Sequence, residues 1–462
     1  MCACFYIVLR RKRIQNQKYM QKLSYRLIIF LVFFIPFFAL AQTNGNNISL
    51  EEALLKAEEN NKEIQKSKAR VDIAKASYLQ SHSLFLPGIN LSHTAVRTND
   101  PLASFGFKLK QEVVTTADFN PVLLNDPGSM ENFQTQIKVE QPLLNFDGIH
   151  ERKAAKYGYE AVSLQSERTS EYVKFEVKKA YKQLQIAQEA VNVFEEVKAS
   201  TDANLKQSLD FFEEDLIKEV DVLAAKVRAL EVEDQLNQTK NQRQGAVDYL
   251  AFLLGFESSN DLIASDPFQE PFMGSRVDDE KTNEDRSDIL AYKKGVLAKE
   301  QMLKSARNKF LPRLNAFGAY EWNDKEFLGT SANNYMIGAS LSWDLFKGYK
   351  NIGMIKKAKA ELQLQKLDFD DYLEQNNLKV KEAKRSLVLS IQKIETGRLA
   401  KEQSGEALRI RTNRFKQGLE KMTDLIQSET LYATKNLEYL NAINNYYSAK
   451  FYLEFLLEKE LK

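Results

Sequence analysis

The spacing of apolar residues divides the chain into long helical segments and short strand-like segments. Between Gly148 and about Phe212, apolar positions recur at alternating intervals of four and three, the seam of a coiled coil: Val173, Val177, Ala180, Leu184, Ala187, Val191 and Phe194. We predict one very long helix here. A helix over 48–84 precedes it, and a helix to about Phe256 follows it after a break near 213–218.

The lengths of these helices indicate how they pack. A helix of about 65 residues is about 100 Å long at roughly 1.5 Å per residue. The helices before and after it together have nearly the same length. We therefore expect them to stack end to end and to pack antiparallel along the long helix. The same plan recurs over 283–309, 349–415 and 419–459.

Four further segments alternate between apolar and polar positions with the period of a β-strand. They cover about 86–97, 133–146, 310–323 and 334–346. Segments of about ten residues with an apolar face, a small or polar face and aromatic residues near the ends are typical of transmembrane β-strands. A half-buried strand of a soluble sheet has the same alternation, so one segment alone does not decide between the two.

The chain consists of two copies of one plan. Shifted by 225 positions, residues 85–87 (Phe-Leu-Pro) fall on the identical residues 310–312. Shifted by 203, residues 249–254 fall on 452–457 with five identities. The shifts differ by 22 positions, so the first copy carries a net insertion. Its obvious place is 98–132, where prolines and glycines indicate a long loop.

The first 41 residues have the parts of a secretory signal peptide. Seven basic residues and no acid accompany the apolar run 27–40, which ends in the small-x-small sequence Ala39-Leu40-Ala41. A membrane anchor is the alternative, but the run is shorter than the roughly 18 residues of a spanning helix. Translation starts at either Met1 or Met20, and both cysteines precede the cleavage site. In an exported protein, four alternating segments in pairs favour strands that span a membrane.

We therefore divide the chain into four parts. These are a signal peptide over 1–41, a first repeat over 42–257 with an extracellular loop at about 98–132, a linker or equatorial region over 258–281, and a second repeat over 282–462.

Composition narrows the function further. Without the leader the chain has 58 basic and 63 acidic residues, and a nucleic-acid-binding protein needs a basic excess. It has three histidines and no pattern for binding a dinucleotide, a nucleotide phosphate or catalytic zinc. We predict no enzyme activity, no catalytic residue, no metal site and no cofactor.

Four strands cannot close a barrel. Single-chain outer-membrane barrels have at least about eight strands, and an open sheet edge cannot face lipid, because its backbone groups would lack hydrogen bonds. If these strands span a membrane, several chains must share one barrel. Three chains would supply twelve strands and surround a lumen with their helices.

The sequence resembles the TolC family of outer-membrane efflux proteins over nearly its whole mature length. The resemblance rests on the duplicated helix–strand–strand–helix–helix plan and on its junctions: Phe85-Leu86-Pro87, Phe310-Leu311-Pro312, Gln141-Pro142-Leu143-Leu144 with Gly148, Trp343-Asp344-Leu345-Phe346 with Gly348, and the turns at Phe212, Leu216 and Asp221 and at Phe415, Gly418 and Asp424.

The resemblance implies a mainly α fold with a transmembrane β part. In such a family, a homotrimer forms a 12-stranded barrel in the outer membrane, surrounded by lipid, and a helical tunnel in the periplasm. The tunnel docks a periplasmic adaptor and an inner-membrane pump, as a passive duct for tripartite efflux or type I secretion. The alternative is a periplasmic coiled-coil adaptor or scaffold without a pore.

The resemblance also places candidate residues at the closed end of the tunnel. Asp424 matches the first acidic ring that constricts the pore, whereas Gln427 stands where a second acidic ring is expected. Glu420 stands where some relatives have an arginine that locks the closed state, and Asp215 replaces the usual turn glycine. Asp221 is the fourth residue of the predicted constriction.

Both Asp221 and Asp424 have a simpler explanation, because an acid in the first turn of a helix caps it or compensates its dipole. For adaptor contact the resemblance implies the helix turns with Leu216, Gly418 and Leu419.

Overall fold

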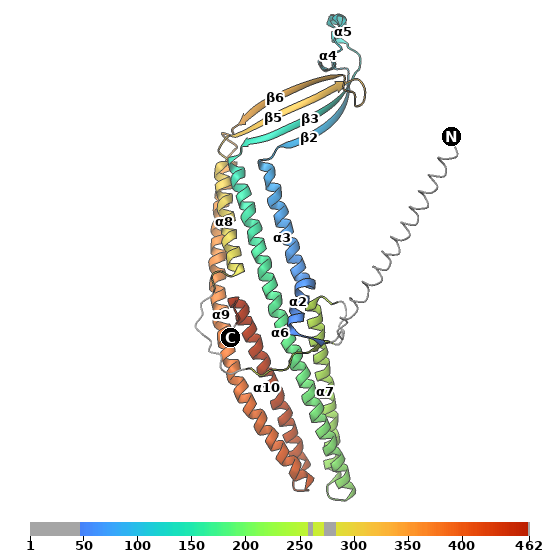
Figure 1. Ribbon diagram of the computed structural model, residues 1–462, viewed down its shortest axis with the longest axis vertical. Helices are drawn as coiled ribbons and strands as arrows, with labels where there is room; N and C mark the ends of the chain where they lie inside the picture. Colours follow the sequence, from blue (N-terminus) through green and yellow to red (C-terminus); the bar gives the residue numbers. More distant parts are fainter. Residues whose placement is uncertain (1–46, 257–261, 272–282, 461–462) are drawn as a thin grey trace, which may run out of the picture.

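The computed structural model describes residues 47–256, 262–271 and 283–460. The molecule is a long helical shaft with a β-sheet at one end, and the sheet leans away from the shaft (Figure 1). The predicted signal peptide and most of the predicted linker lie outside the described residues. No helix in the described ranges is long and apolar enough to cross a membrane.

The first copy follows the predicted order. Its elements are α2 (Leu50–Asn60), α3 (Lys62–Gln80), η1 (Ser81–Leu84), β2 (Gly88–Thr98), β3 (Met130–Leu144), α6 (Phe146–Glu213) and α7 (Glu219–Leu254). The predicted helix over 48–84 is in fact interrupted at Asn61, whose backbone is extended. The Asn61 side chain accepts hydrogen bonds from the backbone N–H groups of Glu63 and Ile64. Asparagine is a favoured N-cap, so Asn61 ends α2 and starts α3.

The second copy repeats this plan. Its elements are α8 (Ser287–Asn308), β5 (Arg313–Asp324), β6 (Ala332–Ser342), α9 (Lys350–Lys416) and α10 (Met422–Leu457). The predicted mainly α fold with a duplicated helix–strand–strand–long helix–helix unit is confirmed.

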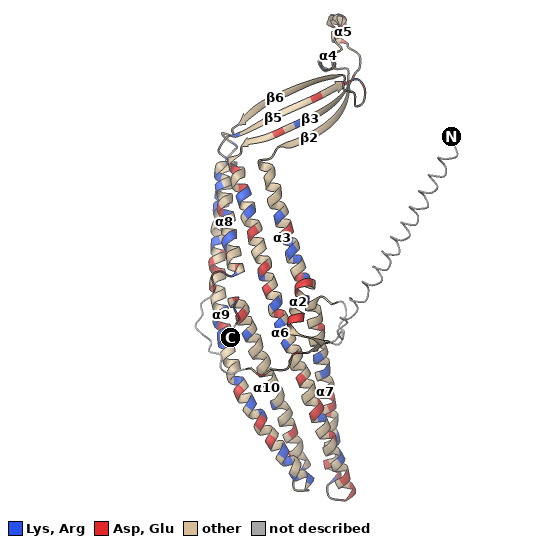
Figure 2. Ribbon diagram, viewed as in Figure 1, with Lys and Arg blue, Asp and Glu red and all other residues tan. Residues whose placement is uncertain are grey.

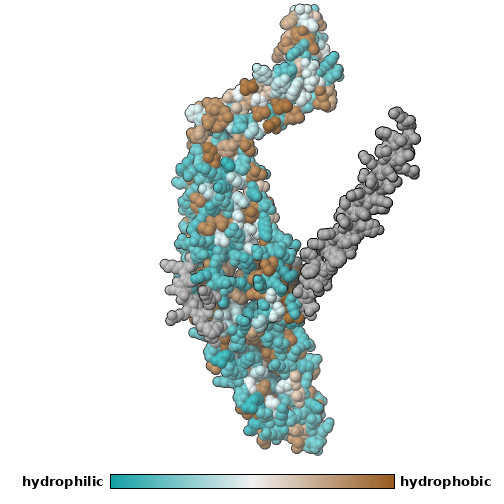
Figure 3. All heavy atoms as spheres, viewed as in Figure 1, coloured by the Kyte–Doolittle hydropathy of each residue, from teal (hydrophilic) through white to brown (hydrophobic). Residues whose placement is uncertain are grey.

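All four strands form one antiparallel sheet in the order β2-β3-β5-β6. Each begins and ends within a few residues of the predicted bounds. In the register, Ile137 lies between Leu91 and Tyr320, and Gln136 lies between Ser92 and Glu321. Neighbouring strands therefore align apolar with apolar and polar with polar, so the sheet has one apolar and one polar face. Figure 3 shows apolar residues gathered on the sheet, whereas the shaft is mostly hydrophilic.

The shaft packs as its helix lengths predict. In the first copy α2, α3 and α7 lie along α6, and in the second copy α8 and α10 lie along α9. Helix α6 also packs against α8 and α10, which joins the copies side by side. The seam residues Val177, Ala180 and Leu184 are fully buried in one cluster with residues of α2 and α7.

A two-stranded parallel sheet crosses the middle of the shaft. It pairs β1 (Asn47–Ile48) with β4 (Ile263–Ala264), which belongs to the described part of the linker. Tyr181 of α6 fastens it, because its hydroxyl donates to the Ile48 carbonyl at 3.0 Å and accepts from the Asp266 backbone N–H at 3.2 Å. Burial raises the pKa of Tyr181 to about 12.

The insertion is not the loop that its prolines predicted. It contains α4 (Pro101–Lys110), η2 (Thr116–Phe119) and α5 (Pro121–Asn125). Pro101 and Pro121 each stand at the start of a helix. Proline is tolerated there because the backbone N–H that it lacks would have no partner within the helix. Asp100 and Asn120 cap these helices through their side chains. Two of the prolines thus mark helix starts, whereas Pro127 does lie in a loop.

Candidate functional site

The two helix turns at the end of the shaft far from the sheet are built alike. Residues 214–218 join α6 to α7, and residues 417–421 join α9 to α10. Asp215 and Gly418 correspond under the 203-residue shift, and both have a left-handed backbone, with φ of 54° and 72°. Glycine favours this conformation and aspartate is among the few residues that tolerate it. The substitution of Asp for the usual Gly therefore leaves the turn conformation unchanged.

Apolar side chains project from these turns into solvent. Leu216 is 68% exposed and Leu419 is 61% exposed, and Val220 and Leu223 in the first turn of α7 are exposed as well. A contiguous exposed apolar surface is typical of an interaction site. Directly beneath it, a buried cluster joins the two turns, and its members are Ala225, Phe415, Met422 and Leu425.

The two aspartates of the predicted constriction differ in their contacts. The Asp221 carboxylate accepts the backbone N–H of Lys218 at 3.4 Å, which is the capping arrangement. The Asp424 side chain is 43% exposed, and its Oδ2 lies 3.9 Å from Arg411 Nη1. Gln427 lies exposed on α10. The four predicted residues are thus at the same end of the shaft, in the turn between α9 and α10 or in the first two turns of α7 and α10.

Glu420 is held by two arginines of α9. Its carboxylate accepts from Arg414 Nε at 2.8 Å and from Arg411 Nη1 at 3.4 Å, and its side chain is only 13% exposed. Arg414 also donates to the backbone carbonyl of Leu419 at 3.1 Å. Neither arginine was predicted from the sequence, although their positions six and nine residues before Glu420 bring them back to it across a tight helix turn. In this chain Glu420 fastens the turn to its own helix.

A second group that was not predicted from the sequence lies deeper, between the two helix pairs. Glu429 of α10 is 2% exposed and Arg228 of α7 is 3% exposed. The Glu429 carboxylate accepts from Asn204 Nδ2 of α6 at 2.5 Å and from Thr201 Oγ1 at 3.4 Å, and lies 3.8 Å from Arg228 Nε. Burial raises the pKa of Glu429. These four residues, which we call the inter-hairpin cluster, connect both helix pairs just above the turns.

The midpoint of the shaft has a corresponding joint in each copy. Asn61 Nδ2 donates to the Leu253 carbonyl at 2.7 Å, and Arg286 Nη1 donates to the Leu456 carbonyl at 2.5 Å. Asn61 and Arg286 correspond under the 225-residue shift, and the two carbonyls correspond under the 203-residue shift. The side chain that starts the upper helix thus binds the end of the lower helix in both copies.

The second joint carries buried charges that the first lacks. Arg286 is completely buried and forms a bidentate pair with Asp288, which also lies 3.1 Å from Arg168 of α6. Burial opposes ionisation of Asp288, but the hydrogen bonds from Arg286 and Tyr372 outweigh it and lower the pKa of that carboxyl.

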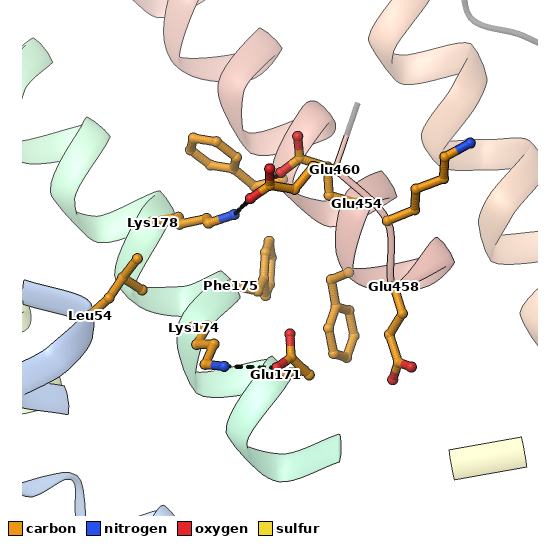
Figure 4. Close-up of a pocket in the computed structure, with 11 residues that line it drawn as sticks. Leu54, Glu171, Lys174, Phe175, Lys178, Glu454, Glu458 and Glu460 are labelled. Carbon is orange, nitrogen blue, oxygen red and sulfur yellow. Dashed lines mark hydrogen bonds and ion pairs between the residues drawn. The ribbon is translucent and has the colours of Figure 1, made fainter. Parts of the chain in front are cut away.

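A groove of about 350 Å³ opens beside this joint (Figure 4). Its floor includes Phe175, and charged residues of α6 and of the end of α10 surround it. These charges pair with one another: Lys178 lies 3.7 Å from Glu454 and 3.8 Å from Glu460, and Lys174 lies 2.9 Å from Glu171. The charged residues around the groove therefore largely neutralise one another, and the groove is a gap between helix ends. Within the described residues, no group of three His, Cys, Asp or Glu side chains is placed to hold a metal ion.

Sequence comparison decides the family. The profile of the family described as outer membrane efflux protein matches residues 53–256 and 280–457, which together are most of the chain. The chain belongs to this family. The sequence has no significant match among proteins with curated functional descriptions.

Solved structures with the same fold include outer-membrane channels. A membrane protein of Pseudomonas aeruginosa superimposes with a TM-score of 0.75 at 18% identity, covering 88% of this chain and 93% of its own. The CmeC outer membrane channel of Campylobacter jejuni gives 0.77 at 15% identity, covering 91% and 90%. The outer membrane protein VceC of Vibrio cholerae gives 0.74 at 16% identity, covering 89% and 97%.

As an outer membrane efflux protein, the chain has its sheet in the outer membrane and its helical shaft in the periplasm. The predicted efflux channel is confirmed, and the alternative of a periplasmic adaptor or scaffold without a pore is not supported. Figure 2 agrees with this location, because charged residues are dense along the shaft and sparse on the sheet.

Proposed function

We propose that three copies of this outer membrane efflux protein form one passive channel without catalytic activity. One observation carries the proposal, namely that the sheet has an apolar face and a polar face, with β2 and β6 at its two edges. Edges in lipid must be paired, and pairing β6 of one copy with β2 of the next satisfies all of them. Three copies give twelve strands, with the polar faces turned to the lumen.

Light scattering of the detergent-purified protein tests the assembly. We expect a trimer mass that is stable to dilution. Proline substituted at two alternate N–H-donating positions of β6 should yield monomers, because proline cannot donate to a strand pair. A wild-type protein that remains monomeric in detergent and in lipid nanodiscs would contradict the proposal.

At the periplasmic end we propose that the turns converge and that Asp424 forms the constriction. Three carboxylates around a narrow mouth repel one another and attract cations, as carboxylate rings do in cation-selective pores. Gln427 leaves the next ring uncharged. Within each copy, Arg411 at 3.9 Å offsets part of the charge of Asp424, and Asp221 supports the turn by capping the first turn of α7.

The Asp424→Ala variant should conduct more in planar bilayers and should be blocked less by multivalent cations. The reason is that the variant removes three negative charges from the narrowest section. Glu438→Ala, higher on the same helix, is the control and should conduct like the wild type. Equal conductance and equal block of the Asp424→Ala and wild-type channels would contradict the placement of Asp424 at the constriction.

We further propose that the exposed turns dock a periplasmic adaptor, which links the channel to an inner-membrane pump. The exposed leucines Leu216 and Leu419 support this, together with Gly418, which keeps the second turn tight. Leu216→Ser combined with Leu419→Ser should weaken binding of the adaptor by tenfold or more, about 1.4 kcal/mol, and leave the melting temperature unchanged. Surface plasmon resonance with a periplasmic adaptor that binds the wild-type channel measures it, and unaltered binding would refute the docking role.

A further inference from the structure

The insertion between β2 and β3 is a folded unit. Lys108 Nζ lies 2.6 Å from Asp118 Oδ1 and ties α4 to η2. The ring of Phe105 meets the ring of Phe119 edge-on at 5.7 Å. Hydrogen bonds from Lys108 and Thr115 hold the pKa of Asp118 at about 2, so this link persists at any physiological pH. These contacts give the insertion an internal packing of its own.

Contacts of Lys110 and Gln111 place the base of this unit on the polar face of the sheet. Lys110 Nζ lies 3.0 Å from Glu321 Oε1 of β5. Gln111 Nε2 donates to Asn132 Oδ1 of β3 at 2.9 Å, and Asn132 Nδ2 donates to Asn323 Oδ1 at 3.0 Å. Gln111, Asn132, Asn323 and Glu321 are all buried. Glu321 faces the same side as Gln134 and Gln136, which also donate to it.

The position of the unit fits the mouth of a channel. It stands at the end of the sheet opposite the shaft (Figure 1), which is the outer end of an outer-membrane protein. Because its base is bound to the polar face, it lies over the lumen side and not over the lipid side. Its other surface is apolar and open: Leu102, Leu109, Phe119 and Val122 are each more than half exposed.

We propose that residues 99–129 are a lid over the outer mouth of the channel, latched by Lys110 to Glu321, and that the three lids of a trimer meet through their apolar surfaces above the lumen. The proposal rests on the trimer proposed above. The occupant of the apolar surface is a second copy of the same unit, because threefold symmetry around the polar faces brings the three lids to one axis. A lid of this kind controls entry from outside, independently of the periplasmic constriction.

Thiol labelling from outside tests the lid without involving the periplasmic end. The exported chain contains no cysteine of its own, since Cys2 and Cys4 precede the predicted cleavage site. Ser92→Cys places a thiol on the polar face of β2, below the lid, and Ala117→Cys places one on the exposed surface of the lid. A bulky, membrane-impermeant PEG-maleimide is added to whole cells.

We expect Ala117→Cys to label at once and Ser92→Cys to label slowly. Adding Lys110→Glu or Glu321→Lys to Ser92→Cys should accelerate its labelling by about tenfold, which corresponds to about 1.4 kcal/mol of latch energy. The charge-swapped double variant should restore slow labelling, which a misfolded protein would not do. Leu102→Asp with Val122→Asp should accelerate labelling as well, because it separates the three lids.

The control is Glu131→Gln, which breaks an exposed ion pair with Arg97 at the same rim and should leave the labelling rate unchanged. If Ser92→Cys labels equally fast with and without the latch charges in protein shown to be trimeric, the lid is refuted. If the aspartates at Leu102 and Val122 have no effect, the contact between lids is refuted. A failure to form trimers would refute the proposed assembly, and the lid with it.

Discussion

Two clusters of buried charged side chains in the described part of the shaft lie where separate helices meet. Glu429 and Arg228 join the two helix pairs near the turns, and Arg286, Asp288 and Arg168 join α6, α8 and α10 at the middle of the shaft. A buried charge is strongly destabilising when it loses its partner, although the pair itself adds little net stability. Such clusters therefore determine which helices pack against one another, and they contribute little to the overall stability of the packing.

Glu429 makes the pairing of the turns sensitive to pH. Its pKa is raised above the ordinary value of 4.5 by burial, so the folded state favours the neutral acid. The neutral acid contributes stability that is fully present below about pH 4.5 and is lost as the pH rises through the raised pKa. Arg228 of α7 and the polar groups of Asn204 and Thr201 on α6 face it, and they offset only part of the cost of ionisation.

We therefore expect the melting temperature of the wild type to fall as the pH rises above 4.5, and to fall less in Glu429→Gln, whose amide does not ionise. Circular dichroism of the purified protein at several pH values measures it. Glu438→Gln, exposed on the same helix and paired with Lys435, is the control and should follow the wild type. A Glu429→Gln profile that parallels the wild type would contradict this role.

At the residue scale the sequence supported some assignments and hid others. The seam residues were predictable because an apolar side chain at heptad spacing has one favourable place, the helix interface. Glu429 and Arg228 were not, because a charged residue on a long helix normally faces water and the burial arises only when the two helix pairs meet. Arg411 and Arg414 were missed for a related reason, since their partner comes from across the turn.

Helix ends decide how the elements fit together. Gly255 ends α7 with a φ of 73°, and a Cβ added there would lie 2.6 Å from the backbone oxygen of Asn60. In the second copy Glu458 takes the corresponding left-handed position, and its carboxylate binds Arg168 and Ser287. In the second copy, the backbone strain at Glu458 is accompanied by the hydrogen bonds of its side chain. In the first copy, glycine at position 255 avoids this strain.

Gly255→Ala should therefore lower the free energy of unfolding by about 2 kcal/mol or more, from backbone strain and from the contact with Asn60. Gly245→Ala is the matched control, because Gly245 lies in the interior of the same helix with no atom near a new Cβ. It should raise stability by about 0.5–1 kcal/mol. Urea denaturation followed by circular dichroism compares them, and equal effects of the two changes would refute the close approach.

The sequence predicted strands and long helices well at the scale of elements, because their periodicities extend over many residues. It failed at Asn61 and in the insertion. One asparagine in a helix-forming run does not by itself predict a helix break. Asn61 nevertheless caps α3, and its side-chain amide also donates a hydrogen bond to the Leu253 carbonyl of α7. Prolines mark loops and helix starts equally, and only the capping contacts of Asp100 and Asn120 distinguish the two.

In the whole molecule, duplication preserved the architecture of the joints but not their chemistry. Asn61 and Arg286 perform the same task at corresponding positions. One uses a neutral amide and the other a buried charge with an acidic partner. The two halves of one chain should therefore differ in how much a substitution at the joint disturbs them.

Arg286→Leu should destabilise the protein by about 3 kcal/mol, because it leaves Asp288 buried with fewer partners. Asn61→Leu should cost only about 1–2 kcal/mol, the loss of neutral hydrogen bonds. Arg398→Leu, which breaks exposed pairs with Glu395 and Glu402, should change stability by less than about 1 kcal/mol. Thermal unfolding of the three variants establishes the order of their stabilities. An Asn61→Leu variant that is less stable than the Arg286→Leu variant would contradict the prediction.

The unbroken helices α6 and α9 have a mechanical consequence. Each carries a continuous hydrogen-bond ladder from the sheet to the turns, whereas their neighbours are interrupted at the joints. The two continuous helices resist stretching of the shaft. The shaft can twist more easily at its middle, where the shorter helices packed along them meet end to end. We therefore expect a twist applied at the periplasmic turns to be taken up mainly at the middle of the shaft, with little of it reaching the membrane-embedded strands.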